Sequence, residues 1–209
     1  MINIAKLKEV IAKKGYVWIE DKPHIIGIRT KLQVPDVFND VIILVYKDTL
    51  FTTTFTTEPG TTYQKKLLNP KGCWVMMPAQ MIDAYSLGYH QNKTDHLALR
   101  SVGKIFGLRE DDKDGIVLND KNAVASWVDG TTVGANIHGA NKTGATKTIG
   151  PWSAGCQVID HWLKKEELIK LLIEFEKANK SLWKTIIEWV FGKSGIRYTY
   201  TLLEEKDFE

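Results

Sequence analysis

The sequence predicts an α+β fold: a mostly antiparallel, β-rich body with a helix at its N-terminus and helices near its C-terminus. Short apolar segments separated by turn residues fill the middle of the chain, and helical apolar periods occur near its two ends. No proline- or glycine-rich linker divides the 209 residues, a length that suits one hydrophobic core. We therefore expect a single domain over 1–209, with a helix over 1–15, a β-rich core over about 16–160 and a helical C-terminal extension over about 160–209.

The first predicted element is an amphipathic helix over residues 3–14. Its apolar face, opposite a face of lysines, consists of Ile4, Leu7, Val10 and Ile11, and Gly15 provides a stop signal. A helix this rich in lysine can lie on a membrane surface. The pattern is more typical of a helix that docks on the body of its own protein.

The central region predicts a series of short strands bounded by turn residues. The threonine-rich run over 52–57 belongs to one of them, because β-branched side chains suit a pleated sheet. The expected strands are Tyr16–Glu20, His24–Thr30, Val41–Tyr46, Phe51–Thr57, 73–78 and 82–89.

Beyond residue 160 the apolar period becomes helical. An apolar stripe that ends at Phe175 predicts a helix over Asp160–Asn179, with the side chain of Asp160 as its N-cap. A second short helix is expected over Ser181–Phe191, and a closing strand over Arg197–Leu202.

Composition and charge exclude several classes of protein. The formal net charge is +3 and no stripe of lysine and arginine with interleaved aromatic residues is present, so we expect no nucleic-acid partner. No apolar run is long enough to cross a bilayer, and the N-terminal residues lack the continuous apolar segment of a secretory signal. We therefore expect no integral membrane segment and synthesis in the cytoplasm. The sequence leaves the oligomeric state open.

Two patterns raise the question of metal binding. The acidic run over 110–115 aligns with an EF-hand calcium loop only until its twelfth position, where Lys121 replaces the required glutamate. A solvated turn is the favoured interpretation, with a weak calcium site at Asp112 and Asp114 as the alternative. The cysteines and histidines show no zinc-site spacing, so we expect no metal and no cofactor.

The residues that carry chemistry are concentrated in 136–140 (Asn-Ile-His-Gly-Ala) and 150–158 (Gly-Pro-Trp-Ser-Ala-Gly-Cys-Gln-Val). A thiol attacks a carbonyl as its thiolate, and a neighbouring imidazole can take the proton. We therefore expect Cys156 as nucleophile and His138 as base, with Gly155 letting backbone amides approach a developing oxyanion. The alternative is that Cys156 is a small buried core residue and that His138 ends a strand.

These two runs resemble the active-site signature of the L,D-transpeptidase catalytic domain, the YkuD-like family. The resemblance extends over about residues 40–160 and is strongest to a divergent branch found in phage and prophage genomes. It implies an L,D-transpeptidase-like body and cysteine chemistry on the stem peptides of peptidoglycan. It also implies that Cys156 and His138 are nucleophile and base, and that Ser153 and Gly155 shape the loop around them.

The sequence departs from the usual form of that signature, Ser-His-Gly-Cys followed by an apolar residue and arginine. Ala154 replaces the histidine, and Val158 stands at the position of the arginine, which is a fixed cation beside the substrate. The histidine that follows the strand over 82–89 either contacts the substrate or lies in a surface loop. The residues expected to contact the substrate are His90, Gly139, Trp152 and Gln157.

Together these features predict a peptidoglycan-cleaving cysteine enzyme, a phage endolysin-type L,D-peptidase that forms a thioester on Cys156 and reaches the bacterial cell wall after release at lysis. The missing arginine and the lack of a visible export signal favour cleavage over crosslinking. The alternatives are an L,D-transpeptidase that crosslinks stem peptides, and a non-catalytic cell-wall-binding or phage structural protein. The other cysteine, Cys73, lies in an apolar segment and is expected to be structural.

Overall fold

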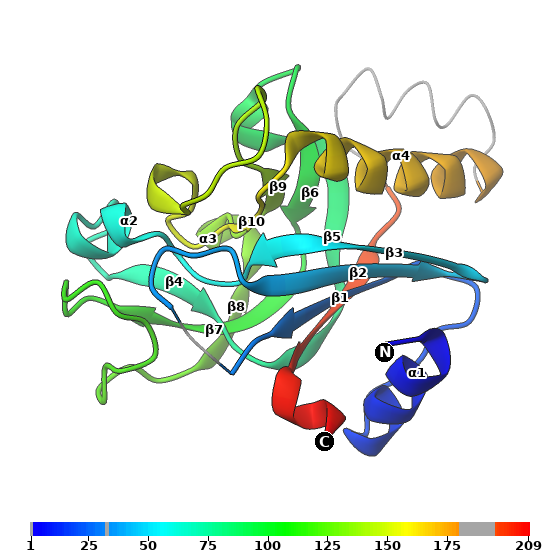
Figure 1. The fold of residues 1–209 in the computed structure, drawn as a ribbon, viewed down its shortest axis with the longest axis horizontal. Coiled ribbons are helices and arrows are strands. Elements are labelled where there is room, and N and C mark those ends of the chain that lie inside the picture. Colours follow the sequence, from blue (N-terminus) through cyan, green and yellow to red (C-terminus); the bar gives the residue numbers. More distant parts are fainter. Residues whose placement is uncertain (1, 32–33, 180–194) are drawn as a thin grey trace.

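The computed structural model describes residues 2–31, 34–179 and 195–209 (Figure 1). Within these ranges eight strands close into a barrel, and three more form a second sheet. The barrel order is β1 (His24–Arg29), β11 (Tyr198–Glu204), β5 (Ala79–Tyr89), β6 (Leu97–Ser101), β9 (Ile137–Gly139), β10 (Gln157–Ile159), β3 (Thr49–Thr56) and β2 (Asp40–Tyr46). The second sheet consists of β4 (Cys73–Met76), β7 (Lys104–Glu110) and β8 (Ser126–Asp129).

The helical elements in the described part of the chain are short except for two. They are α1 (Ile4–Lys13), α2 (Thr61–Lys65), α3 (Gly130–Val133), α4 (Trp162–Asn179) and the 3-10 turns η1 (His90–Asn92), η2 (Gly150–Trp152) and η3 (Glu205–Phe208). Most strand pairs are antiparallel; β1 with β11 and β9 with β10 are the parallel ones. The α+β class, the predominance of strands and the terminal helices α1 and α4 confirm the prediction at this level. The L,D-transpeptidase-like character of the body stays a prediction.

The strands β1 and β2 are buried on both faces because α1 covers the outside of the barrel. Successive residues of a strand point to opposite faces, so Ile25 and Ile42 fill the interior while Ile26 and Ile43 point outward. Leu7, Val10 and Ile11 of α1 pack on those outward side chains and are almost completely buried. Burial of each such side chain contributes roughly 1.5–3 kcal/mol. The prediction that this helix docks on the body of the protein is therefore confirmed.

The segment over 16–20, predicted as a strand, is irregular instead. Its backbone is satisfied by side chains, since the Val17 N–H donates to the amide oxygen of Gln80 and the Gln80 amide nitrogen donates back to the Val17 carbonyl, both at 2.8 Å. Trp18 stacks on His24 with ring centroids 4.0 Å apart. A side-chain amide thus takes the place of a neighbouring strand, which periodicity does not predict.

Helix α4 begins at Trp162, two residues later than predicted, and packs on β6, β9 and β10. The N-cap is His161 rather than Asp160: the ring Nδ1 of His161 accepts from the Leu163 N–H at 3.2 Å, and its carbonyl accepts from the Lys165 N–H. No helix in the described part of the chain is long and apolar enough to span a bilayer.

The C-terminal region is only partly helical. The predicted closing strand is present as β11, which lies in the barrel between β1 and β5, so the expected helical extension contributes a barrel strand. The predicted helix over Ser181–Phe191 lies outside the described residues. The acidic run near residue 112 forms an exposed turn in which the Asp114 carboxylate accepts from the Ile116 N–H at 2.7 Å.

Candidate active site

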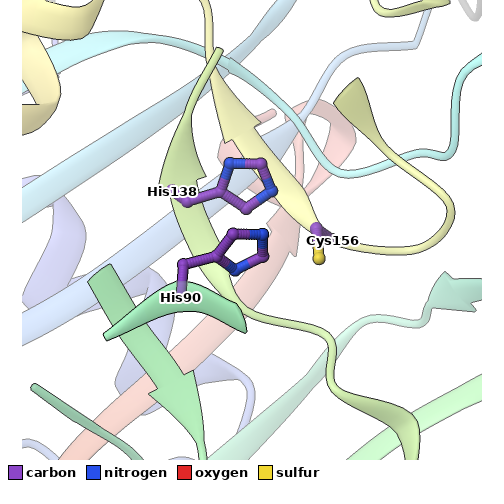
Figure 2. A group of neighbouring side chains, drawn as sticks. All are labelled: His90, His138 and Cys156. Carbon is purple, nitrogen blue, oxygen red and sulfur yellow. The ribbon is translucent and has the colours of Figure 1, made fainter. Parts of the chain in front are cut away.

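Adjacent barrel strands bring the two motif runs together. β9 lies between β6 and β10 and pairs in parallel with β10, with His138 opposite Val158. The Gln157 N–H donates to the Asn136 carbonyl at 2.9 Å, which fixes Cys156 at the entry of β10 beside the strand that carries His138. Figure 2 shows the imidazoles of His138 and His90 directed toward Cys156. The predicted nucleophile and base are therefore neighbours in space.

Cys156 is a partly exposed, free thiol. Its S–H group donates to the Gly134 carbonyl at 3.4 Å. Burial of the sulfur raises the pKa of the Cys156 thiol to about 11, and the backbone of Asn136 acts in the opposite direction. Cys73 is buried and also free, so no disulfide joins the two. Near pH 7 the resting group is a neutral thiol.

His138 is held in one tautomer by its own strand. The residue is only 4% exposed, and its Nδ1 lies 2.9 Å from the Gly139 carbonyl oxygen. Because a carbonyl only accepts, Nδ1 carries the proton and Nε2 is left as an acceptor. Burial, followed by the charge of a protonated His90, lowers the pKa of His138 to about 3, so the ring is neutral at physiological pH.

His90 presents the opposite tautomer. It stands at the start of η1, and its ring stacks on that of His138 with centroids 4.1 Å apart. The Asn136 side-chain oxygen accepts from the Ser101 backbone N–H at 3.0 Å, so its amide nitrogen is the atom that donates to His90 Nδ1 at 3.1 Å. With Nδ1 an acceptor, the proton of His90 lies on Nε2. Burial, then the nearby Lys93 and Arg100, lower the pKa of His90 to about 4.

A third histidine, His96, joins this cluster and was missed by the sequence analysis. Its ring lies 4.9 Å from that of His90 and 5.4 Å from that of His138. His96 lies close to His90 in the sequence, and the hairpin between β5 and β6 brings the two residues together. The His90 N–H donates to the His96 carbonyl at 2.8 Å across this hairpin. Burial, followed by a protonated His90, lowers the pKa of His96 to about 4.

Ser153 and Gly155 shape the loop that precedes Cys156. The Ser153 hydroxyl donates to the Cys156 carbonyl at 2.5 Å and accepts from the Gly155 N–H at 3.2 Å. Gly155 has a φ of +133°, and a Cβ there would lie 2.7 Å from the Cβ of Trp74, so only glycine fits. The Gly155 N–H is bonded inside the loop, so of the backbone amides near Gly155 and Cys156 this one is not free to hold an oxyanion.

The site opens into a pocket of about 400 Å³ between the barrel and the second sheet. Its walls include Cys156, Gly155 and His90 on the barrel side, and Cys73, Trp74 and Arg109 on the side of the second sheet. His138 lies behind His90 and Cys156, out of contact with the pocket itself. A ligand in the pocket therefore meets the sulfur and His90 directly.

Three of the four expected substrate contacts do not line the pocket. Gln157 is fully buried, with its amide nitrogen donating to the Tyr85 hydroxyl at 3.1 Å and its amide oxygen accepting from the Tyr200 hydroxyl. Alternation along β10 turns its side chain away from the pocket and into the barrel. Gly139 faces α4, and Trp152 lies in η2 with 37% of its surface exposed. Only His90 lines the pocket.

A metal ion is the other chemistry that this cluster fits. Donor atoms of His90, His138 and Cys156 all lie within 4.8 Å of one another, and two imidazoles with one thiolate are zinc ligands. The bond from Asn136 counts against this assignment. It occupies Nδ1 of His90 and leaves the proton on Nε2, whereas a metal needs an unprotonated nitrogen.

Comparison with protein-family models and with curated proteins gives no match for this chain. The fold and the site define a class: an α+β protein in which two adjacent barrel strands place Cys156 on a pocket wall beside the buried His138, and in which His90 of η1 lines the same wall.

Proposed function

We propose that the protein is a cysteine-dependent acyl-transfer enzyme that cleaves peptidoglycan stem peptides, as a phage endolysin-type L,D-peptidase. The observation that carries the acyl-transfer part is the placement of Cys156 on a pocket wall, next to an imidazole whose Nε2 is an acceptor. The peptidoglycan part rests on the motif resemblance. Action on the cell wall after release at lysis belongs to the same proposal.

The chemistry starts from neutral groups. Burial disfavours both the thiolate of Cys156 and the imidazolium of His138, so no ion pair forms at rest. The thiol hydrogen leaves the Gly134 carbonyl and turns toward Nε2 of His138. As the sulfur bonds to the substrate carbonyl carbon, the proton passes to that nitrogen, and the carbonyl π electrons move onto oxygen.

Collapse of the tetrahedral intermediate completes the first half of the reaction. The C–N bond breaks, the leaving amine takes the proton from His138, and an acyl thioester remains on Cys156. Water then attacks the thioester, gives one proton to His138, and the sulfur leaves as thiolate and regains that proton. An amine in place of water would give a crosslink, so the acceptor decides between hydrolysis and transpeptidation.

His90 supplies the donor that the Gly155 amide does not. Its Nε2 carries a proton, and its ring lines the same pocket wall as the sulfur. A carbonyl oxygen next to Cys156 would accept that hydrogen as negative charge develops. Loss of one such donor typically lowers kcat by about 10²–10³-fold.

Hydrolysis is favoured over crosslinking because Val158 stands where the family places its arginine. A transpeptidase has to hold an acceptor amine against competition from water, and the fixed cation that the resemblance places beside the substrate is absent at this position. The departure from the motif therefore favours the cleaving enzyme as first candidate and the transpeptidase as second.

The test is to incubate the protein with defined muropeptides and to identify the products by mass spectrometry, with Cys156→Ala and His138→Gln as variants. Shortened stems that carry one oxygen from labelled water, absent with Cys156→Ala, are the expected result. His161→Gln, a change at the start of α4 outside the site, is the matched histidine control and keeps wild-type turnover. Crosslinked dimers would indicate the transpeptidase. Wall binding that survives Cys156→Ala, without any turnover, would indicate a binding protein.

A further inference from the structure

The pocket is positively charged. Its lining includes the guanidinium-bearing residues Arg100 and Arg109, and no aspartate or glutamate among the described residues lines it. The two arginines come from different sheets, Arg100 from β6 of the barrel and Arg109 from β7 of the second sheet. Two cations with no balancing acid in a concave site focus positive potential there and attract an anionic ligand.

Arg109 is fixed in place by contacts with uncharged groups. It also lines a neighbouring cavity with Asp111 and Asp120, but the described residues form no ion pair with it. One guanidinium nitrogen donates to the Gly72 carbonyl at 2.7 Å, and the guanidinium carbon lies 5.8 Å from the centroid of the Trp74 ring. A guanidinium has five N–H donors, so several remain for a ligand. A side chain held in this way loses little conformational entropy when it binds an anion.

Arg100 reaches the reactive end of the pocket. It shares the pocket wall with His90, and its charge is among the causes that lower the pKa of that ring. Among the ion pairs that the described residues form, none involves Arg100 or Arg109. Both arginines line the pocket whose wall includes Cys156, and each also lines one neighbouring cavity.

We propose that Arg100 and Arg109 bind a free carboxylate of the acyl donor and thereby position its scissile carbonyl at Cys156. The substrate class is a peptide with a carboxylate near the bond that is cleaved. This proposal rests on the proposed function for its substrate, whereas the anion-binding pocket stands on geometry alone. The carboxylate has two sources, a peptide C-terminus or an acidic side chain, and guanidinium groups recognise both in the same bidentate way.

The pocket is tested first without any peptide, by comparing two alkylating agents on Cys156. Iodoacetate carries a carboxylate and iodoacetamide is its neutral analogue, and peptide mass spectrometry reports the Cys156 rate for each. The rate ratio of iodoacetate to iodoacetamide is expected to exceed, by about tenfold, the ratio for the same cysteine in denatured protein. The double variant Arg100→Gln/Arg109→Gln should return the rate ratio to the value for denatured protein. The double variant Arg100→Lys/Arg109→Lys keeps both positive charges and should keep much of the increase in the ratio.

Lys104→Gln serves as the matched charge control, since Lys104 is exposed at the start of β7, the strand that carries Arg109, and does not line this pocket. An equal ratio in folded and denatured protein would overturn the proposal, as would a ratio that survives the double glutamine variant. A variant that unfolds exposes the sulfur of Cys156 fully. It is recognised because its alkylation by iodoacetate and its alkylation by iodoacetamide both become faster.

The substrate is then tested with acyl-donor peptides in which the terminal carboxylate, the side-chain carboxylate or both are amidated. A fall in kcat/KM of about tenfold or more for one of the amidated peptides supports the proposal and identifies the source. Equal turnover of all peptides overturns it while leaving the proposed enzyme intact. Anion-selective alkylation with no turnover of any peptide would instead count against the proposed function and leave the anion pocket standing.

Discussion

His90 and His138 stack with ring centroids 4.1 Å apart, and each ring is fixed through its Nδ1 by a different partner. The Gly139 carbonyl makes one ring a donor at Nδ1 and hence an acceptor at Nε2. The Asn136 amide makes the other ring an acceptor at Nδ1 and hence a donor at Nε2. Two neutral imidazoles in complementary tautomers can serve one reaction as base and as oxyanion donor.

Changing Asn136 should therefore alter His90 rather than the nucleophile. In Asn136→Asp the new carboxylate would still accept from the Ser101 N–H but would favour a proton on Nδ1 of His90, so the pKa of His90 should rise. We expect kcat to fall by about 10²–10³-fold, because a proton moved from Nε2 to Nδ1 removes one oxyanion donor. Nitrogen chemical shifts of the imidazole would report the tautomer directly, and Asn122→Asp in the exposed turn is the surface control. An unchanged His90 shift would contradict the assignment.

The depressed pKa of His138 predicts a loss of stability in acid. Its pKa falls from an ordinary 6.5 to about 3 on folding, so between these values the unfolded chain binds a proton that the folded chain does not. Stability then rises with pH across this window and is lost as pH falls below 6.5, with a slope of up to ~1.4 kcal/mol per pH unit. Buried acids such as Glu58, whose pKa rises to about 7, act in the opposite sense.

The prediction for His138 is therefore tested by comparing how the free energy of unfolding depends on pH in the wild type and in His138→Gln. Urea unfolding at pH 7, 6, 5 and 4 should give a shallower acid loss in His138→Gln than in the wild type. Parallel curves for the two proteins would mean that this histidine titrates normally in the folded state.

Cys156 should react with iodoacetamide much faster than Cys73. Burial raises the pKa of both thiols to about 11, so acidity does not separate them. Solvent exposure of the residues separates them. Cys73 also lines the pocket but is only 4% exposed, and its S–H group donates to the Tyr63 carbonyl at 2.9 Å, whereas Cys156 is partly exposed beside the acceptor nitrogen of His138. Mass-spectrometric labelling rates near neutral pH would check this. Equal slow labelling of both would argue that the sulfur of Cys156 is inaccessible.

Gly155 should tolerate no side chain. A Cβ at this position would lie 2.7 Å from the Cβ and 2.9 Å from the carbonyl oxygen of Trp74, in addition to the strain of a φ of +133°. Gly144 has a φ of +148°, but a Cβ added there would meet nothing within 4 Å, so Gly144→Ala isolates the backbone strain. We expect Gly155→Ala to lower the free energy of unfolding by ~1–3 kcal/mol more than Gly144→Ala and to abolish turnover. Thermal melts of both variants test this.

Zinc should inhibit turnover and not support it. The His90, His138 and Cys156 donors can close on a metal only if the His90 proton moves from Nε2, and the metal would then hold the nucleophile as a thiolate. Activity should persist after dialysis against EDTA and fall on addition of Zn²⁺. Activity that disappears with EDTA and returns with Zn²⁺ would assign a metalloenzyme instead.

The proximity of Cys156 and His138 was predictable because the two residues lie in two short runs whose residue types are typical of one site; their roles as nucleophile and base stay a prediction. The parallel pairing of β9 and β10 then places Cys156 beside His138, as the motif requires. Gln157 was expected at the substrate and is buried among tyrosines, since its neighbour Cys156 faces the pocket and side chains alternate along a strand. A motif gives residue identity, and it does not show to which side of the sheet each side chain points.

The sequence by itself determined the α+β class, the docked N-terminal helix and the candidate cysteine and histidine. These features depend on the spacing of apolar residues and on short motifs, and both are properties of consecutive residues. Only the tertiary structure decided that β11 closes the barrel, that His90 and His96 join His138, and that Arg100 and Arg109 meet at one pocket. These relationships join segments far apart in the chain. They follow from barrel closure and strand register, which the packing of the whole core sets and no single stretch encodes.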